Sequence, residues 1–182
     1  DVADQDYISA RMSYRAELEQ QFLWNSLQAI EKYLKAILLF NAKSAKGIRH
    51  DLKKGLSLVK AITDIHFQLP DDVVEFVEYL NNFGANRYLI HPTHIRRHSL
   101  LELDKSVWYV RRYCYFMRGT IKRADGSVTQ LLEYEVKKVH HPEYEKHPFK
   151  LRITGGYIEK IMEKKTFTSG ALIWKNFFLS LV

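Results

Sequence analysis

The apolar and polar positions divide the chain into two parts of different character. Up to residue 118, apolar side chains recur every three or four positions, which is the spacing of amphipathic helices. This period predicts helices over residues 7–17, 18–42, 50–64, 70–80 and 100–118. We therefore expect an up-and-down antiparallel bundle of about five helices in residues 1–118.

After Gly119 the pattern becomes an alternation of apolar and charged residues. Leu132, Tyr134 and Val136 alternate with Glu and Lys, and residues 149–153 repeat the pattern. A period of two is typical of half-buried strands.

The segment between these two alternating stretches, His140-His141-Pro142, favours a turn. We expect a β-hairpin over 126–154 and, after Gly155-Gly156, two short helices within 157–181. The predicted fold is thus mainly α, with residues 119–182 forming a C-terminal extension packed on the bundle.

Composition limits the class of protein. The chain has 182 residues, 46% of them hydrophobic, which suffices for one domain with an appendage and a core. Its single cysteine, Cys114, excludes an internal disulfide, favours a buried inert thiol and is typical of the cytoplasm. No apolar run is long enough to span a bilayer, so we expect no membrane partner.

The net charge of +7 is concentrated in one segment. Residues 79–124 hold nine Lys or Arg and two acidic residues, which leaves 19 basic and 19 acidic residues in the rest of the chain. Such a segment is either a solvated basic surface or a face that binds phosphate or an acidic partner. Arginines and aromatic residues also alternate near its end, a composition that suits single-stranded RNA as well as a packed core.

Three short motifs resemble the HEPN family, the higher eukaryote and prokaryote nucleotide-binding domain, and in particular its Arg-Tyr branch. The motifs are Gln28-Ala29-x-Glu31-Lys32-x-x-Lys35, His50-Asp51-Leu52 and Asn86-Arg87-Tyr88. The resemblance covers residues 4–118. It implies a helical bundle that forms a homodimer, a nucleotide or RNA ligand, and relatives that act as ribonuclease toxins or partner a nucleotidyltransferase antitoxin.

The motif residues also have plain structural interpretations. Lys32 and Lys35 lie on a polar stripe of one helix, where Glu31 pairs with Lys35 at i,i+4 or where the lysines line a phosphate site. Asp51 suits a helix N-terminus, and we interpret His50 as a capping and packing residue rather than a catalytic one.

Members of the family that cleave RNA carry an Arg followed by a His. The Arg stabilises charge on the phosphate and the His takes a proton from the ribose hydroxyl. Arg87 and His94, with six residues between them, match this spacing, and His91 is a substitute. Tyr88 and Pro92 depart from the active pattern, so ribonuclease activity is an alternative to binding alone.

His91, His94 and His98 have a spacing that suggests a metal, but Pro92 interrupts the helix and no carboxylate completes the set. We expect neither a metal nor a cofactor. The leading hypothesis is a nucleotide- or RNA-binding domain with a basic cleft around Arg87 to Arg123. A protein-interaction module that partners a nucleotidyltransferase is a further alternative. The predicted ligand-binding residues are Lys32, Lys35, Arg87, Tyr88, Arg96, Arg97, Arg111 and Arg112.

Overall fold

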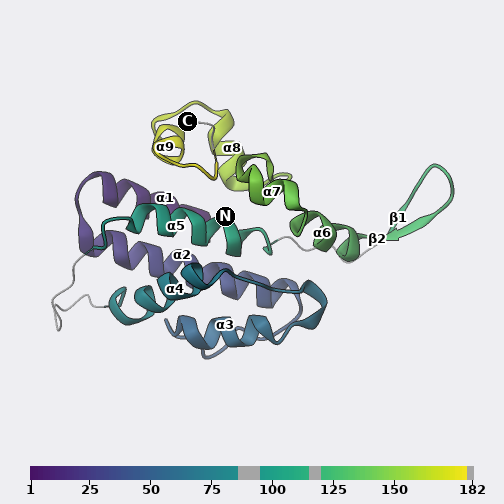
Figure 1. The fold of residues 1–182 in the computed structure, drawn as a ribbon, viewed down its shortest axis with the longest axis horizontal. Helices are drawn as coiled ribbons and strands as arrows, with labels where there is room; N and C mark the ends of the chain where they lie inside the picture. The colour runs from purple at the N-terminus through teal and green to yellow at the C-terminus, as the bar shows by residue number, and fades with distance from the viewer. Residues whose placement is uncertain (86–94, 115–119, 180–182) are drawn as a thin grey trace.

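The computed structural model describes residues 1–85, 95–114 and 120–179, and most of them are helical (Figure 1). The elements of the first part are α1 (Val2–Arg15), α2 (Glu19–Phe40), α3 (Leu52–Lys60), the 3-10 helix η1 (Thr63–Ile65), α4 (Asp71–Phe83) and α5 (Ser99–Arg111). The second part holds β1 (Thr120–Lys122), β2 (Val128–Gln130), α6 (Leu131–Val139), α7 (Pro142–Lys146), η2 (Pro148–Lys150), α8 (Tyr157–Glu163) and α9 (Phe167–Ile173).

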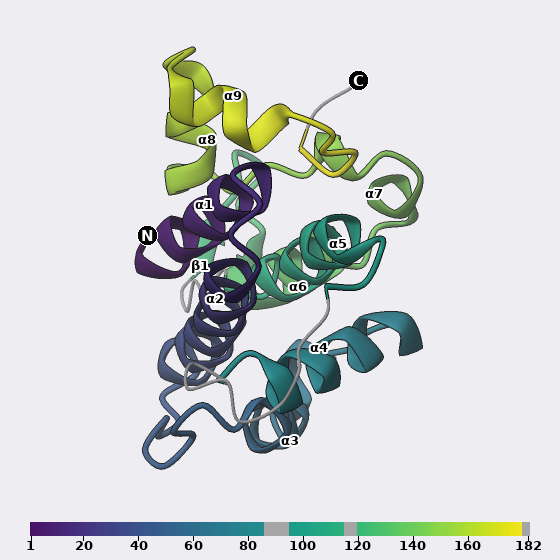
Figure 2. The ribbon, with the colours of Figure 1, turned by 90° about the vertical axis from the view of Figure 1, so that its left-hand side faces the viewer.

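Helix α2 is the centre of the bundle and packs against α1, α3, α4 and α5. Its apolar face, which includes Phe22, Leu27 and Leu34, is fully buried. Burying such large apolar side chains is the main stabilising contribution to the fold. The predicted bundle of five helices is therefore confirmed (Figures 1 and 2).

Local signals set most helix boundaries. The Asp51 side chain accepts a hydrogen bond from the backbone N–H of Lys54 at 2.9 Å, so it caps α3 as its position predicts. Pro70 precedes the first turn of α4. Helix α5 ends at Arg111 and gives way to a turn, so the predicted helix over 100–118 was too long.

The predicted hairpin over 126–154 is wrong. Residues 131–139 form α6, and the strands that do pair, β1 and β2, place Thr120 opposite Gln130. Leu132 and Val136 fit a helical spacing as well as an alternation, because a short window cannot separate the two periods, and Val139 fits only the helical spacing. The Glu and Lys residues between them are strong helix formers, which favours the helix.

The two short helices expected within 157–181 are present, although α9 lies earlier than the sequence suggested. Helices α8 and α9 lie beside α1 in both views (Figures 1 and 2). Ile158 of α8 and Leu172 of α9 are fully buried and join the hydrophobic core of the bundle. Among the described residues, no helix is long and apolar enough to cross a membrane.

Candidate functional site

Arg111 joins α1, α5 and α8. Its Nε donates to Asp4 Oδ1 at 2.7 Å, and its two terminal nitrogens donate to the Glu159 carboxylate at 2.9 and 2.7 Å. The Tyr33 hydroxyl donates to the same Asp4 oxygen at 2.7 Å. Burial alone would raise the pKa of Glu159, but the hydrogen bonds and charge of Arg111 outweigh it and lower that pKa. The Arg111 charge is thus engaged by two carboxylates.

Arg112, the residue that follows the last residue of α5, is buried as well. It donates to Glu145 Oε1 at 2.8 Å, and its guanidinium carbon lies 4.6 Å from the Trp108 ring centroid and 4.5 Å from that of Tyr109. Trp108 is itself buried and donates through Nε1 to the Pro148 carbonyl at 3.1 Å. Arg112 and Trp108 therefore connect α5 to the C-terminal extension. Arg112 was predicted to bind a ligand, but here it is buried in a contact within the protein.

Arg11 makes a third junction of this kind. Its fully buried guanidinium pairs with Asp104 and donates to the backbone carbonyl of Ala171 at 2.9 Å. The Tyr7 hydroxyl donates to Asp104 Oδ1 at 2.6 Å. Burial raises the pKa of Asp104 to about 6, although Arg11 and Tyr7 both act to lower it.

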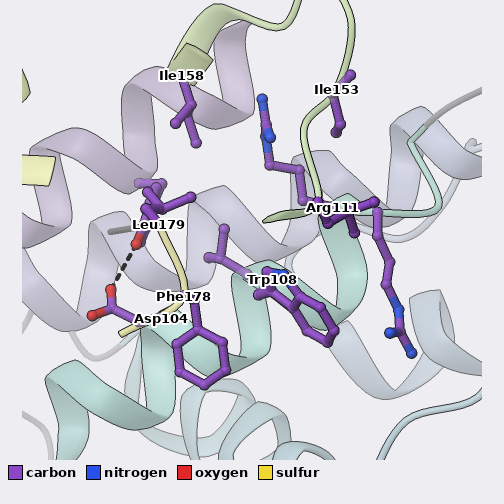
Figure 3. Close-up of a pocket in the computed structure, with 11 residues that line it drawn as sticks. Asp104, Trp108, Arg111, Ile153, Ile158, Phe178 and Leu179 are labelled. Carbon is purple, nitrogen blue, oxygen red and sulfur yellow. Dashed lines mark hydrogen bonds between the residues drawn. The ribbon is translucent and has the colours of Figure 1, made fainter. Parts of the chain in front are cut away.

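The cavity at this interface is too small for a nucleotide. Its volume is about 20 Å³, which is enough for one water molecule. Figure 3 shows Asp104, Trp108 and Arg111 on α5 facing Ile158 and Leu179 of the extension. The interface between α5 and the extension is therefore a packed contact.

A larger cleft of about 340 Å³ lies between α1, α2 and residues 153–157. Lys32 lines it and donates to Asp6 Oδ2 at 2.5 Å. Cys114 lines it too, and its thiol donates to the Tyr33 carbonyl at 3.4 Å. Burial raises the pKa of the Cys114 thiol to about 12, so the thiol is unreactive at neutral pH.

The residues just before α5 keep their positive charge at the surface. Arg96, Arg97 and His98 are exposed, and the Arg96 guanidinium carbon lies 4.3 Å from the centroid of the Tyr79 ring. Arg96 approaches Glu102 at 3.6 Å, whereas Arg97 has no carboxylate partner among the described residues. A stacked guanidinium and an unpaired one side by side suit a planar base and a phosphate.

Arg87, Tyr88, His91 and His94 lie outside the described residues, so the predicted arrangement of a catalytic Arg and His remains a prediction. Within residues 1–85, 95–114 and 120–179, the structure brings together no group of three His, Cys, Asp or Glu side chains able to hold a metal ion.

The two predicted motifs of α2 and His50 meet in space. Glu31 is 2% exposed, pairs with Lys35, and accepts a hydrogen bond from His50 Nδ1 at 2.6 Å. Gln28 Nε2 lies 3.1 Å from the same His50 nitrogen, and the Trp24 ring centroid is 5.3 Å from that of His50. Burial would raise the pKa of Glu31, but the hydrogen bonds from Lys35 and His50 dominate and lower it. Glu31 is therefore ionised and holds Lys35 and His50, whereas the sequence analysis treated His50 as a capping and packing residue.

A second basic segment surrounds His50. Residues 43–54 hold five Lys or Arg and one acidic residue, Asp51. The five basic residues are all exposed. The signal was present in the sequence, but the equal numbers of basic and acidic residues outside 79–124 concealed it.

The comparisons agree with the motifs. The model of the HEPN domain matches residues 1–90, which include α1 to α4, Glu31 and His50. Neither a curated protein nor a solved structure matches the chain. The N-terminal half of the chain is therefore a HEPN domain and belongs to that family.

Proposed function

We propose that this HEPN domain binds the phosphate of a nucleotide or RNA through the exposed basic residues Arg96 and Arg97, just before α5. The observation that carries the proposal is the position of Arg96 and Arg97, which are exposed while Arg111 and Arg112 of the same basic segment are buried against carboxylates. Lys122 and Arg123 belong to the β1–β2 hairpin, which projects away from the bundle (Figure 1). The proposed binding surface therefore includes fewer residues than the basic cleft around Arg87 to Arg123 that the sequence predicted.

Arg96 and Arg97 suit this ligand for two reasons. A guanidinium binds phosphate oxygens through two parallel N–H donors, and its flat face stacks on a base. Packing on Tyr79 holds the Arg96 plane in place, which reduces the side-chain entropy lost on binding.

Binding of a fluorescent single-stranded RNA, measured by anisotropy over a range of salt concentrations, tests the proposal. We expect affinity to fall steeply with salt, and the double variant Arg96→Ala/Arg97→Ala to bind at least about tenfold more weakly with a shallower salt slope. Lys122→Ala/Arg123→Ala on the hairpin is the matched control and should bind as the parent does. Affinity that is independent of salt, or equal in both double variants, contradicts the proposal.

Ribonuclease activity with Arg87 and His94, formed across a homodimer, is a separate proposal that rests on the resemblance. An Arg87→Ala or His94→Ala variant that cleaves RNA as well as the parent removes it. The proposed pairing with a nucleotidyltransferase predicts a complex that survives high salt poorly, because the basic segment would meet an acidic partner.

A further inference from the structure

The backbone at Arg49 and His50 is unusual for residues with side chains. The N–H of Asp51 donates to the Ile48 carbonyl at 2.8 Å, which closes a four-residue turn. Both central residues have positive φ, 41° at Arg49 and 68° at His50. Turns of this kind favour Asn and Gly at the central positions, so an Arg-His pair is strained there. Strain maintained at an exposed turn calls for a role of these side chains beyond closing the turn.

Helix α2 fixes the orientation of the His50 ring. Trp24, Gln28 and Glu31 lie one turn apart along one face of α2, and all three contact the imidazole. Because Glu31 binds Nδ1, the Nε2 edge is the one left for another partner. The His50 side chain is 48% exposed.

The charges around this ring favour an anion. Glu31 and Lys35 face it from α2, and Arg49 and Asp51 flank it in the turn. The two acids are already engaged, Glu31 by Lys35 and His50, and Asp51 by the N–H of Lys54. Lys54 also donates to the Gly47 carbonyl at 3.1 Å, which holds the basic loop against the start of α3. Asp51 keeps its negative charge, so the preference for an anion comes from the five exposed basic residues of segment 43–54, which outnumber it.

From these contacts we propose that the turn Ile48–Asp51 is a phosphate-binding site, in which the Nε2 edge of His50 and the guanidinium of Arg49 bind one phosphate group. Glu31 is a positioning residue, since its carboxylate holds Nδ1 of the ring and leaves Nε2 for the phosphate. The phosphate belongs to a free nucleotide or to a nucleic-acid backbone. This proposal is independent of the one for Arg96 and Arg97, because a single tetrahedral dianion is enough to occupy the site at His50.

Titration of the full chain with sodium sulfate at constant ionic strength tests the site, with the imidazole resonances followed by NMR. Sulfate stays a dianion across the pH range used, so only the protein titrates. His66 is the matched control, because it is also exposed with positive φ, yet no carboxylate lies within salt-bridge distance of it among the described residues.

We expect a saturable shift of the His50 resonances and none of His66. His50→Gln should weaken sulfate binding about tenfold, as expected for the loss of one charge-assisted hydrogen bond. His66→Gln should leave binding unchanged. Binding should also be weaker at high pH, because an imidazole without a proton on Nε2 offers no donor to sulfate, and this dependence should vanish in His50→Gln.

Arg49→Gly is the variant that separates loss of binding from loss of folding, because glycine relieves the strain in the turn while the guanidinium is removed. It should melt at the same temperature as the parent or higher and bind sulfate several-fold more weakly. Glu31→Gln should weaken sulfate binding, because the imidazole loses the carboxylate that orients it. Equal shifts of His50 and His66, or unchanged affinity in both His50→Gln and Arg49→Gly, overturn the proposal.

Two further ligands identify the source of the phosphate. The affinity of each ligand is divided by its number of phosphate groups. If this value for adenosine monophosphate is at least as high as that for a single-stranded RNA oligonucleotide, the natural ligand is a free nucleotide. Tighter binding of the oligonucleotide indicates the backbone. Failure of Arg96→Ala/Arg97→Ala to weaken RNA binding contradicts the proposed function alone, since sulfate binding at His50 is measured separately.

Discussion

Two groups of cationic side chains in this protein have opposite environments. Arg11, Arg111 and Arg112 are buried at the interface between bundle and extension, and each binds a carboxylate. Arg49 and His50 are exposed on a strained turn and keep their outward faces clear of carboxylates among the described residues. The difference shows that basic side chains in this protein stabilise the fold where they are buried against a distant carboxylate and form a candidate binding surface where they stay exposed.

The largest effect should come from removing Arg11. Arg11→Met leaves Asp104 buried without its cation, and the free energy of unfolding should fall by about 3–5 kcal/mol in urea unfolding experiments. Arg97→Met, at the surface, is the control and should change it by less than about 0.5 kcal/mol. Similar losses in the free energy of unfolding for both variants would show that buried and exposed arginines contribute equally to stability.

Asp104 should give the junction a pH dependence. Its pKa is raised to about 6 in the folded protein, above the ordinary value of 3.8, so the folded state binds a proton that the unfolded state has released. Stability from this group is therefore greatest below about pH 4, falls by about 3 kcal/mol as the pH rises to about 6, and then levels off.

Urea unfolding of the parent and Asp104→Asn across this range measures the effect as their difference. A difference that does not change with pH would mean that Asp104 titrates normally.

Gly156 permits the Arg111–Glu159 pair. A Cβ at this position would lie 2.1 Å from Glu159 Oε2 and 2.9 Å from an Arg111 terminal nitrogen. Gly156→Ala should therefore displace the pair and lower the free energy of unfolding by about 1–3 kcal/mol. Gly170→Ala is the matched control, because nothing lies within 4 Å of its Cβ position and alanine favours α9. Equal effects of the two substitutions would contradict the close approach at Gly156.

The smallest effect should be a gain. Arg49→Gly places glycine where φ is 41°, and thermal or urea unfolding should show a stabilisation of about 0.5–1 kcal/mol. Lys46→Gly, in the same loop and without a positive φ, should give no gain. A loss of stability in Arg49→Gly would show that the Arg49 side chain stabilises the turn.

The length of a pattern decided how well the sequence predicted secondary structure. Helix α2 keeps its apolar period over 22 residues, so its position was predicted closely. Helix α6 has only 9 residues, and Leu132 and Val136 within it satisfy a helical period and an alternation alike. The pattern over residues 126–154 therefore predicted strands where the chain forms helices.

The candidate site was predictable where its partners are close in sequence. The α2 motif and His50-Asp51-Leu52 were identified together, and the Glu31–His50 contact joins them. The partners of Arg111 are 107 and 48 residues away, so no local pattern indicated that its charge is engaged. The strained turn carries no Asn-Gly signal, so no local pattern indicated how the turn presents the His50 side chain.

A chemical-shift map of the full chain bound to a single-stranded RNA oligonucleotide tests the central claim most directly. We predict that the shifts cluster at residues 43–54 and 96–98, where cationic side chains are exposed, and are absent from residues 131–179. Shifts concentrated around Arg111 and Arg112 at the interface with the extension, or no saturable shifts at all, would contradict the account.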